Sequence, residues 1–118
     1  MPQDHPIRIV PNPNRVCVRL GDKLVVDTKR ALTLFEASYP GVLYVPRDDA
    51  DMSLMRRTAH KTHCPYKGDA AYYTVEAGDR TAENAVWTYE HPLAGVTEIA
   101  GYLAFYPNRV EITEDRAA

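Results

Sequence analysis

Short runs of alternating or β-branched apolar residues, each bounded by turn residues, constrain the fold of this chain more than any other feature. In the run RVCVRL (15–20), Val16 and Val18 lie on one face and Cys17 on the other, which is the period of a half-buried strand with Cys17 exposed. Gly21 then supplies a turn. Similar runs predict strands at 24–27, 31–36, 42–45, 70–75, 81–89, 102–106 and 110–113, the last two paired around residues 107–108.

Three segments depart from this pattern. Residues 1–14 contain four prolines, which predicts an extended arm, so that a single folded domain spans 15–114 and a tail follows at 115–118. Asp48 is placed to cap a helix that ends near Arg57, with acidic residues in its first turn and basic residues in its last. Residues 92–100 are expected to form a loop with one short helical turn. The predicted class is mainly β (α+β with one short helix), arranged as a sandwich or small open barrel.

Composition narrows the range of partners. The 118 residues fit one domain, and a hydrophobic fraction of 45% is ordinary for a soluble globular protein. With a net charge of −2 and dispersed basic residues, neither nucleic acid nor a membrane is expected as a partner. The start of the sequence does not resemble a signal peptide, so we expect a cytoplasmic protein in which Cys17 and Cys64 are free thiols. A homo-oligomer is left open.

The segment THCPYKG (62–68) gathers the most reactive side chains. Pro65 and Gly68 are typical of a tight turn, and they need no functional explanation. Cys64, beside an imidazole and an ammonium, is either an activated nucleophile or a small apolar residue that seats the turn. His60, His63 and Cys64 have the side chains of metal ligands, but adjacent residues of an extended chain diverge and no second ligand pair follows. We therefore predict no metal and no other cofactor.

Aromatic and charged residues elsewhere suggest a pocket. Eight tyrosines and one tryptophan could fill the core or line a small-molecule site, and both interpretations are open. Arg47 is a candidate for binding a carboxylate or phosphate, although a surface salt bridge would explain it equally well. Glu36 is either a buried general base or a solvated charge.

Three segments together resemble a known family. They read GDKLVVDTKRALTLFEASYPGVLYVPRDDADM, THCPYKGDAAYYTV and NAVWTYEHPLAGVTEIAGYLAFYPNRVEI, and in order and spacing they are similar to the bacterial and fungal domain of unknown function 427, which is sometimes labelled a nucleotidyltransferase. The resemblance implies a tent-like fold, in which two antiparallel sheets meet at an angle over one cavity. Relatives of this architecture often hold zinc on two Cys-x-x-Cys knuckles, which are absent here. The motif residues that carry over are Glu36, Tyr44, Arg47, Cys64, Tyr66, Lys67, Gly68, Tyr72, Trp87 and Tyr89.

These observations lead to two hypotheses. In the first, the chain binds a small anionic or polar metabolite in a pocket lined by Tyr44, Tyr72, Trp87 and Tyr89, where Arg47 and Lys67 meet an anionic group. If it is an enzyme, acid/base chemistry by Lys67, Tyr66 or Glu36 is favoured over covalent chemistry by Cys64. In the second, the same face is a non-catalytic module that binds a protein or peptide.

Overall fold

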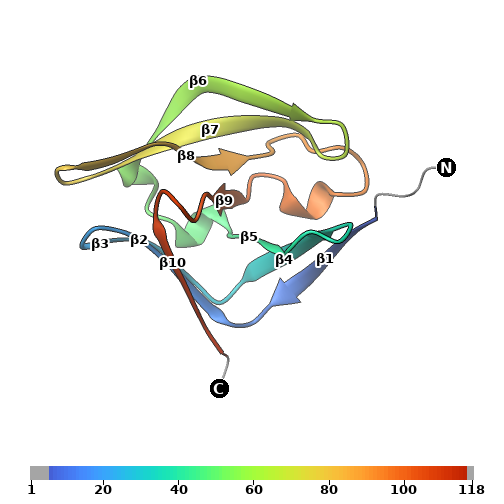
Figure 1. Ribbon diagram of the computed structural model, residues 1–118, viewed down its shortest axis with the longest axis horizontal. Helices are drawn as coiled ribbons and strands as arrows, with labels where there is room; N and C mark the ends of the chain where they lie inside the picture. The colour runs from blue at the N-terminus through green and yellow to red at the C-terminus, as the bar shows by residue number, and fades with distance from the viewer. Residues whose placement is uncertain (1–5, 117–118) are drawn as a thin grey trace.

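The computed structural model describes residues 6–116 and shows a mainly β protein, as the sequence predicts. Within these residues the strands form three antiparallel sheets, and none of them closes into a barrel. In Figure 1 the four-stranded sheet lies above the two three-stranded sheets, which diverge below it. The first sheet has the order β1-β4-β5, with β1 Ile7–Asn12, β4 Ala31–Glu36 and β5 Val42–Tyr44. The second has the order β10-β2-β3, with β10 Glu111–Asp115, β2 Arg15–Leu20 and β3 Lys23–Thr28. The third has the order β6-β7-β8-β9, with β6 Met55–Cys64, β7 Gly68–Ala77, β8 Arg80–Thr88 and β9 Leu103–Phe105.

The four-stranded sheet is covered on both faces. Tyr72 of β7 stands opposite Trp87 of β8, and the next pair along is Tyr73 with Val86. Because side chains alternate along a strand, these two pairs point to opposite faces of the sheet. Val86 belongs to one buried cluster and Tyr72 to another, so the sheet separates two hydrophobic cores.

The larger core packs the four-stranded sheet against the second sheet, and it includes Val16, Val18, Val75 and Phe105. The smaller core packs the four-stranded sheet against the first sheet and contains Leu34, Tyr44, Tyr72 and Tyr89. A single bridge between Val45 and Leu103 joins the two sheets that enclose the smaller core.

The helix expected over 48–57 is wrong. Two 3-10 helices, η1 Arg47–Asp49 and η2 Met52–Leu54, occupy its first part, and β6 begins at Met55. The backbone between them pairs with β3, since Ala50 bridges Val26 and the Asp51 N–H donates to the Val25 carbonyl. These pairings to β3 are incompatible with a continuous helix.

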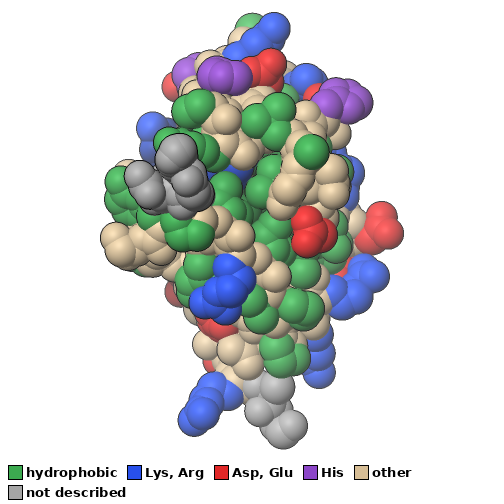
Figure 2. Space-filling view, turned by 90° about the vertical axis from the view of Figure 1, so that its right-hand side faces the viewer, with side chains coloured by type: hydrophobic (Ala, Val, Ile, Leu, Met, Phe, Trp, Pro, Cys, Tyr) green, Lys and Arg blue, Asp and Glu red, His purple; other side chains and the backbone are tan. Residues whose placement is uncertain are grey.

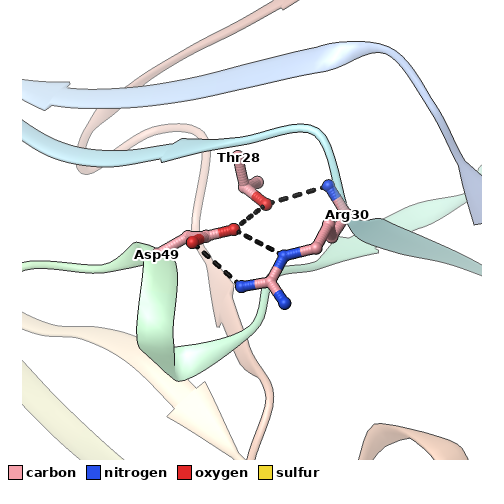
Figure 3. Close-up of polar contacts among 3 residues, drawn as sticks. All are labelled: Thr28, Arg30 and Asp49. Carbon is pink, nitrogen blue, oxygen red and sulfur yellow. Dashed lines mark hydrogen bonds and ion pairs between the residues drawn. The ribbon is translucent and has the colours of Figure 1, made fainter.

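Asp49 fixes η1 to the turn after β3. Its carboxylate accepts from the Thr28 hydroxyl at 2.6 Å and from the Arg30 guanidinium at 3.0 and 3.2 Å (Figure 3). The Arg30 hydrogen bonds, followed by that of Thr28, hold the pKa of Asp49 below its usual value. Asp49, one of the acidic residues that suggested a helix N-terminus, therefore acts as a tertiary link.

The expected start of the fold at Arg15 is also too late, because β1 pairs with β4 along its whole length. Pro11 is compatible with this strand, since β1 lies at a sheet edge where an absent N–H costs nothing. Residues 1–5 of the expected arm and 117–118 of the expected tail lie outside the described residues. The short turn expected within 92–100 is confirmed by η3 Thr97–Ile99.

Two further expectations for the strands are corrected. β9 and β10 do not pair around residues 107–108, because β10 crosses to the second sheet and pairs with β2. This pairing makes β2 a central strand, so Cys17 lies between Thr113 and Asp27 and is buried rather than exposed. None of the short helices within residues 6–116 has the length and apolarity needed to cross a bilayer.

Candidate functional site

The segment THCPYKG forms the turn between β6 and β7, rather than a loop that follows a helix. Cys64 ends β6, Gly68 begins β7, and the Lys67 N–H donates to the Cys64 carbonyl at 3.3 Å. Gly68 has φ +113°, a conformation that other residues rarely adopt. The Lys67 carbonyl accepts from the Leu93 N–H at 3.0 Å, which ties the turn to the loop after β8. Lys67 is thus held in place through its backbone.

Lys67 forms a largely buried ion pair with Glu36. Only 8% of Lys67 is exposed, and its Nζ donates to Glu36 Oε1. Glu36 ends β4 of the first sheet, so the pair connects that sheet to the four-stranded one. Lys67 Nζ also lies 6.0 Å from the centre of the Tyr89 ring, on the ring face that attracts a cation. An ion pair that is removed from water costs desolvation energy, which makes it a candidate for function.

A cluster of aromatic side chains adjoins this pair through Tyr89. Tyr44 and Tyr89 are buried, and the Trp87 Nε1–H donates to the Tyr44 hydroxyl at 3.2 Å. Burial raises the pKa of Tyr44 to about 12 and raises the pKa of Tyr89 well above its usual value. Both phenols are therefore neutral near pH 7 and can donate hydrogen bonds. The structure brings Tyr44, Tyr72, Trp87 and Tyr89 into one cluster, to which β5 of the first sheet contributes Tyr44 and the four-stranded sheet contributes Tyr72 and Trp87.

Tyr72 extends the cluster outward through a ladder of hydroxyl groups. Its hydroxyl lies 3.0 Å from that of Thr62 and 3.1 Å from that of Tyr106. The Tyr106 ring lies 4.6 Å from that of Trp87. Burial, then the Tyr72 hydrogen bond, raises the pKa of Tyr106 to about 12. The sequence pattern places Tyr106 on a strand but does not single it out as a site residue, although it is the third residue of the segment Ala-Phe-Tyr-Pro (104–107) within the family motif.

Arg47 has partners of its own, away from the Lys67 cluster. Its Nε donates to the Gly101 carbonyl at 3.3 Å and its Nη1 to the Tyr73 hydroxyl at 3.1 Å. Tyr73 points to the opposite face of the sheet from Tyr72 and packs on the larger core. No contact that joins Arg47 to Lys67 is found among residues 6–116, so their convergence on one anion stays a prediction.

The remaining residues of the turn have separate surroundings. Cys64 is half-buried and contacts the smaller core, and Tyr66 is 47% exposed. The His60 ring contacts the Tyr72 ring in an edge-to-face arrangement, whereas His63 Nδ1 lies 2.6 Å from Asp69 Oδ1. Within residues 6–116 there is no group of three or more His, Cys, Asp or Glu side chains placed to hold a metal ion.

The fold and the cluster define a class of protein: a mainly β domain with a largely buried ion pair beside a cluster of aromatic side chains. Residues 8–116 match the family model described as a domain of unknown function (DUF427), and the chain belongs to this family. The short name of that family model refers to a nucleotidyltransferase, which is the label sometimes given to this family. No match is found among curated proteins.

Proposed function

We propose that this protein binds a small anionic or polar metabolite at the Lys67–Glu36 pair. The observation that supports this most is the burial of Lys67, which is only 8% exposed and whose Nζ lies 6.0 Å from the centre of the Tyr89 ring. Small-molecule sites are commonly apolar and aromatic, with a few convergent polar groups that fix the orientation of the ligand. On the right-hand face of Figure 1, a hollow ringed by hydrophobic side chains has a basic side chain at its bottom (Figure 2).

The charges of the pair limit what the ligand can be. Lys67 is already paired with Glu36, so an anionic group must either replace the Glu36 carboxylate at Nζ or share the three N–H donors of Nζ with it and add a net negative charge. A ligand that carries both a carboxylate and an amine can instead bind both side chains and keep the net charge of the site at zero. Neutral Tyr44 and Tyr89 offer hydroxyl groups to such a ligand.

The same groups can perform acid/base chemistry. A carboxylate and an ammonium in contact can exchange a proton with a bound substrate. Low exposure to water strengthens the electrostatic interaction of each group with that substrate. Catalysis of this kind would use Lys67 and Glu36, with Tyr66 near the surface. Cys64 is a weaker candidate because its position before Pro65, at the end of β6, serves the turn.

One observation favours a protein- or peptide-binding module as the second candidate. Tyr39, Tyr66 and Leu93 are 66%, 47% and 46% exposed. Each adjoins the pair, since the Tyr39 N–H donates to the Glu36 carbonyl, Tyr66 precedes Lys67, and the Leu93 N–H donates to the Lys67 carbonyl. Exposed apolar side chains that gather around one site are typical of an interaction surface.

Both cysteines are free thiols, which is typical of a reducing compartment, so we propose a cytoplasmic location. Fractionation of the native host, with detection of the endogenous protein, tests this. Recovery mainly in the membrane or secreted fraction would contradict it.

A screen of small carboxylates, amino acids and phosphates by amide NMR tests the proposed function. We expect at least one compound to shift the Lys67, Gly68 and Tyr89 amides. Lys67→Gln should abolish the shifts, whereas the matched control Lys61→Gln, at an exposed position of β6, should retain them. If no compound binds but Tyr66→Ala loses a defined peptide ligand, the interaction module is correct and the metabolite site is wrong.

A further inference from the structure

A cavity lies outside the Lys67 site, beside Tyr72 and Tyr106 of the hydroxyl ladder. It has a volume of about 400 Å³, and its lining comes from β6, β7, β8 and the segment after β9. The lining residues are His60, Tyr72, Glu83, Asn84, Tyr106, Asn108 and Arg109, and we refer to them as the Tyr106 groove. None of the groove residues except Tyr72 takes part in the proposed metabolite site.

Irregular strands build this groove. β6 pairs with β7 at Arg57–Tyr73 and again at Lys61–Ala71. Between these two pairs β6 has three residues, 58–60, whereas β7 has only Tyr72, so β6 bulges. On the other side, β8 has residues 83–85 opposite Thr74 alone. Bulges of this kind redirect side chains and occur often beside binding sites.

Hydrogen bonds hold the bulges in place. Asn84 has φ +50°, and its N–H donates to the Thr74 hydroxyl at 3.0 Å. Its side-chain oxygen accepts from the Thr58 hydroxyl at 2.6 Å, which links the bulge of β8 to the bulge of β6. The backbone irregularities are therefore fixed, and the groove exists before a ligand binds.

The floor of the groove is aromatic. Tyr106 is 37% exposed, so part of its ring is open to solvent although the Trp87 ring lies only 4.6 Å away. Its hydroxyl is fixed by Tyr72, whose own hydroxyl is fixed by Thr62. A ring face with negative charge density attracts the slightly positive C–H groups of a saturated ring, as well as other aromatic rings.

The rim is polar, and its charges balance. Arg109 is anchored by a 2.9 Å hydrogen bond from its Nη1 to the Glu83 carbonyl oxygen, which leaves a planar guanidinium at the rim. Glu83 supplies one carboxylate, while the Asn84 and Asn108 amides each offer donors and acceptors. The carboxylate of Glu83 and the guanidinium of Arg109 offset each other in the lining, so the two leave no excess positive charge for a phosphate. Planar side chains around an exposed ring suit a ligand that has an apolar face and hydroxyl groups at its edge.

We propose that the Tyr106 groove binds a neutral sugar ring. The C–H face of the ring lies on Tyr106, and its hydroxyl groups exchange hydrogen bonds with Arg109, Glu83 and Asn108. A ring without charge fits the balanced rim, whereas a nucleotide would bring a phosphate that the rim does not neutralise.

The test is a titration with the methyl glycosides of glucose, galactose and mannose, followed by amide NMR. We expect at least one of them to shift the Asn108 and Arg109 amides in a saturable way. The open-chain alcohol sorbitol has comparable hydroxyl groups but no ring, and it should not saturate these shifts. If no glycoside gives saturable shifts, or if sorbitol binds equally well, the proposal is wrong.

Variants then assign the binding to the groove. Arg109→Ala removes an exposed side chain and should weaken the binding by about tenfold, the usual effect of one lost charge-assisted hydrogen bond. Arg56→Ala is the matched control, since Arg56 is an exposed residue of β6 that pairs with Glu76 outside the groove. Tyr106→Phe keeps the ring and should retain binding, whereas Tyr106→Ala should abolish it. Equal affinity in Arg109→Ala and Arg56→Ala would contradict the proposal.

Discussion

Replacement of Glu36 by Gln should destabilise the protein strongly, because it leaves the Lys67 ammonium without its carboxylate. The side chains of Lys67 and Glu36 are 10% and 22% exposed, so neither charge is well solvated. Removal of one partner from a fully buried ion pair costs about 3–5 kcal/mol, and the remaining exposure here lowers the expected loss to about 2–3 kcal/mol. At this chain length, such a loss corresponds to a decrease in Tm of roughly 8–12 °C.

A double variant separates the charge effect from the effect of packing. Glu36→Gln combined with Lys67→Met removes both charges and should recover most of the lost stability, because no charge is then left buried without a partner. Equilibrium denaturation in urea measures both losses, with the fluorescence of Trp87, the only tryptophan, as the signal. A loss below about 0.5 kcal/mol for Glu36→Gln would refute the reasoning, because that is the behaviour of a surface salt bridge.

Three other predictions concern the rest of the fold. The pKa of Tyr44 is raised from 10.0 to about 12, so its burial stabilises the protein fully below pH 10, and this contribution is lost as the pH rises towards 12. Between pH 10 and 12 the free energy of unfolding should therefore fall less in Tyr44→Phe than in the wild type, and identical pH profiles would contradict this. Gly41→Ala should cost about 1 kcal/mol in urea denaturation, the low end of the cost of overpacking, because at this exposed position its Cβ would lie 2.7 Å from the Thr33 side chain. A thiol reagent should modify half-buried Cys64 before buried Cys17 in the native protein, and the reverse order in peptide mapping would contradict the structure.

Sequence patterns predicted eight of the ten strands within residues 6–116, because the signals of these strands are local, and missed β1 and β6. The alternation in RVCVRL and the turn residue Gly21 depend only on near neighbours, and β2 and β3 form where they were expected. The helix over 48–57 failed because tertiary pairing of Ala50 with Val26 overrides the capping signal of Asp48. The strand β1 was missed because it contains proline. Proline is tolerated in a strand at the edge of a sheet, and the sequence does not reveal that β1 is an edge strand.

The candidate site was predicted in part. The family motif placed Glu36, Lys67 and the aromatic residues on one list, and the structure brings most of them together. The family motif did not reveal that Glu36 is the partner of Lys67. Glu36 ends β4 and Lys67 precedes β7, and the two residues are 31 positions apart in the sequence. The sequence grouped Arg47 with Lys67 because both are cations. In the structure Arg47 donates to Tyr73, which points to the face of the four-stranded sheet opposite to that of Tyr72.

The affinity of Lys67 variants for a bound metabolite tests the central claim most directly. Calorimetric titration of the best compound from the carboxylate, amino-acid and phosphate screen gives the dissociation constants of the wild type, Lys67→Gln and Lys61→Gln. We predict that Lys67→Gln weakens binding by about a hundredfold, as expected when a largely buried charged contact is lost, while Lys61→Gln binds like the wild type. Equal dissociation constants for all three proteins would contradict the claim that the Lys67–Glu36 pair is the binding site.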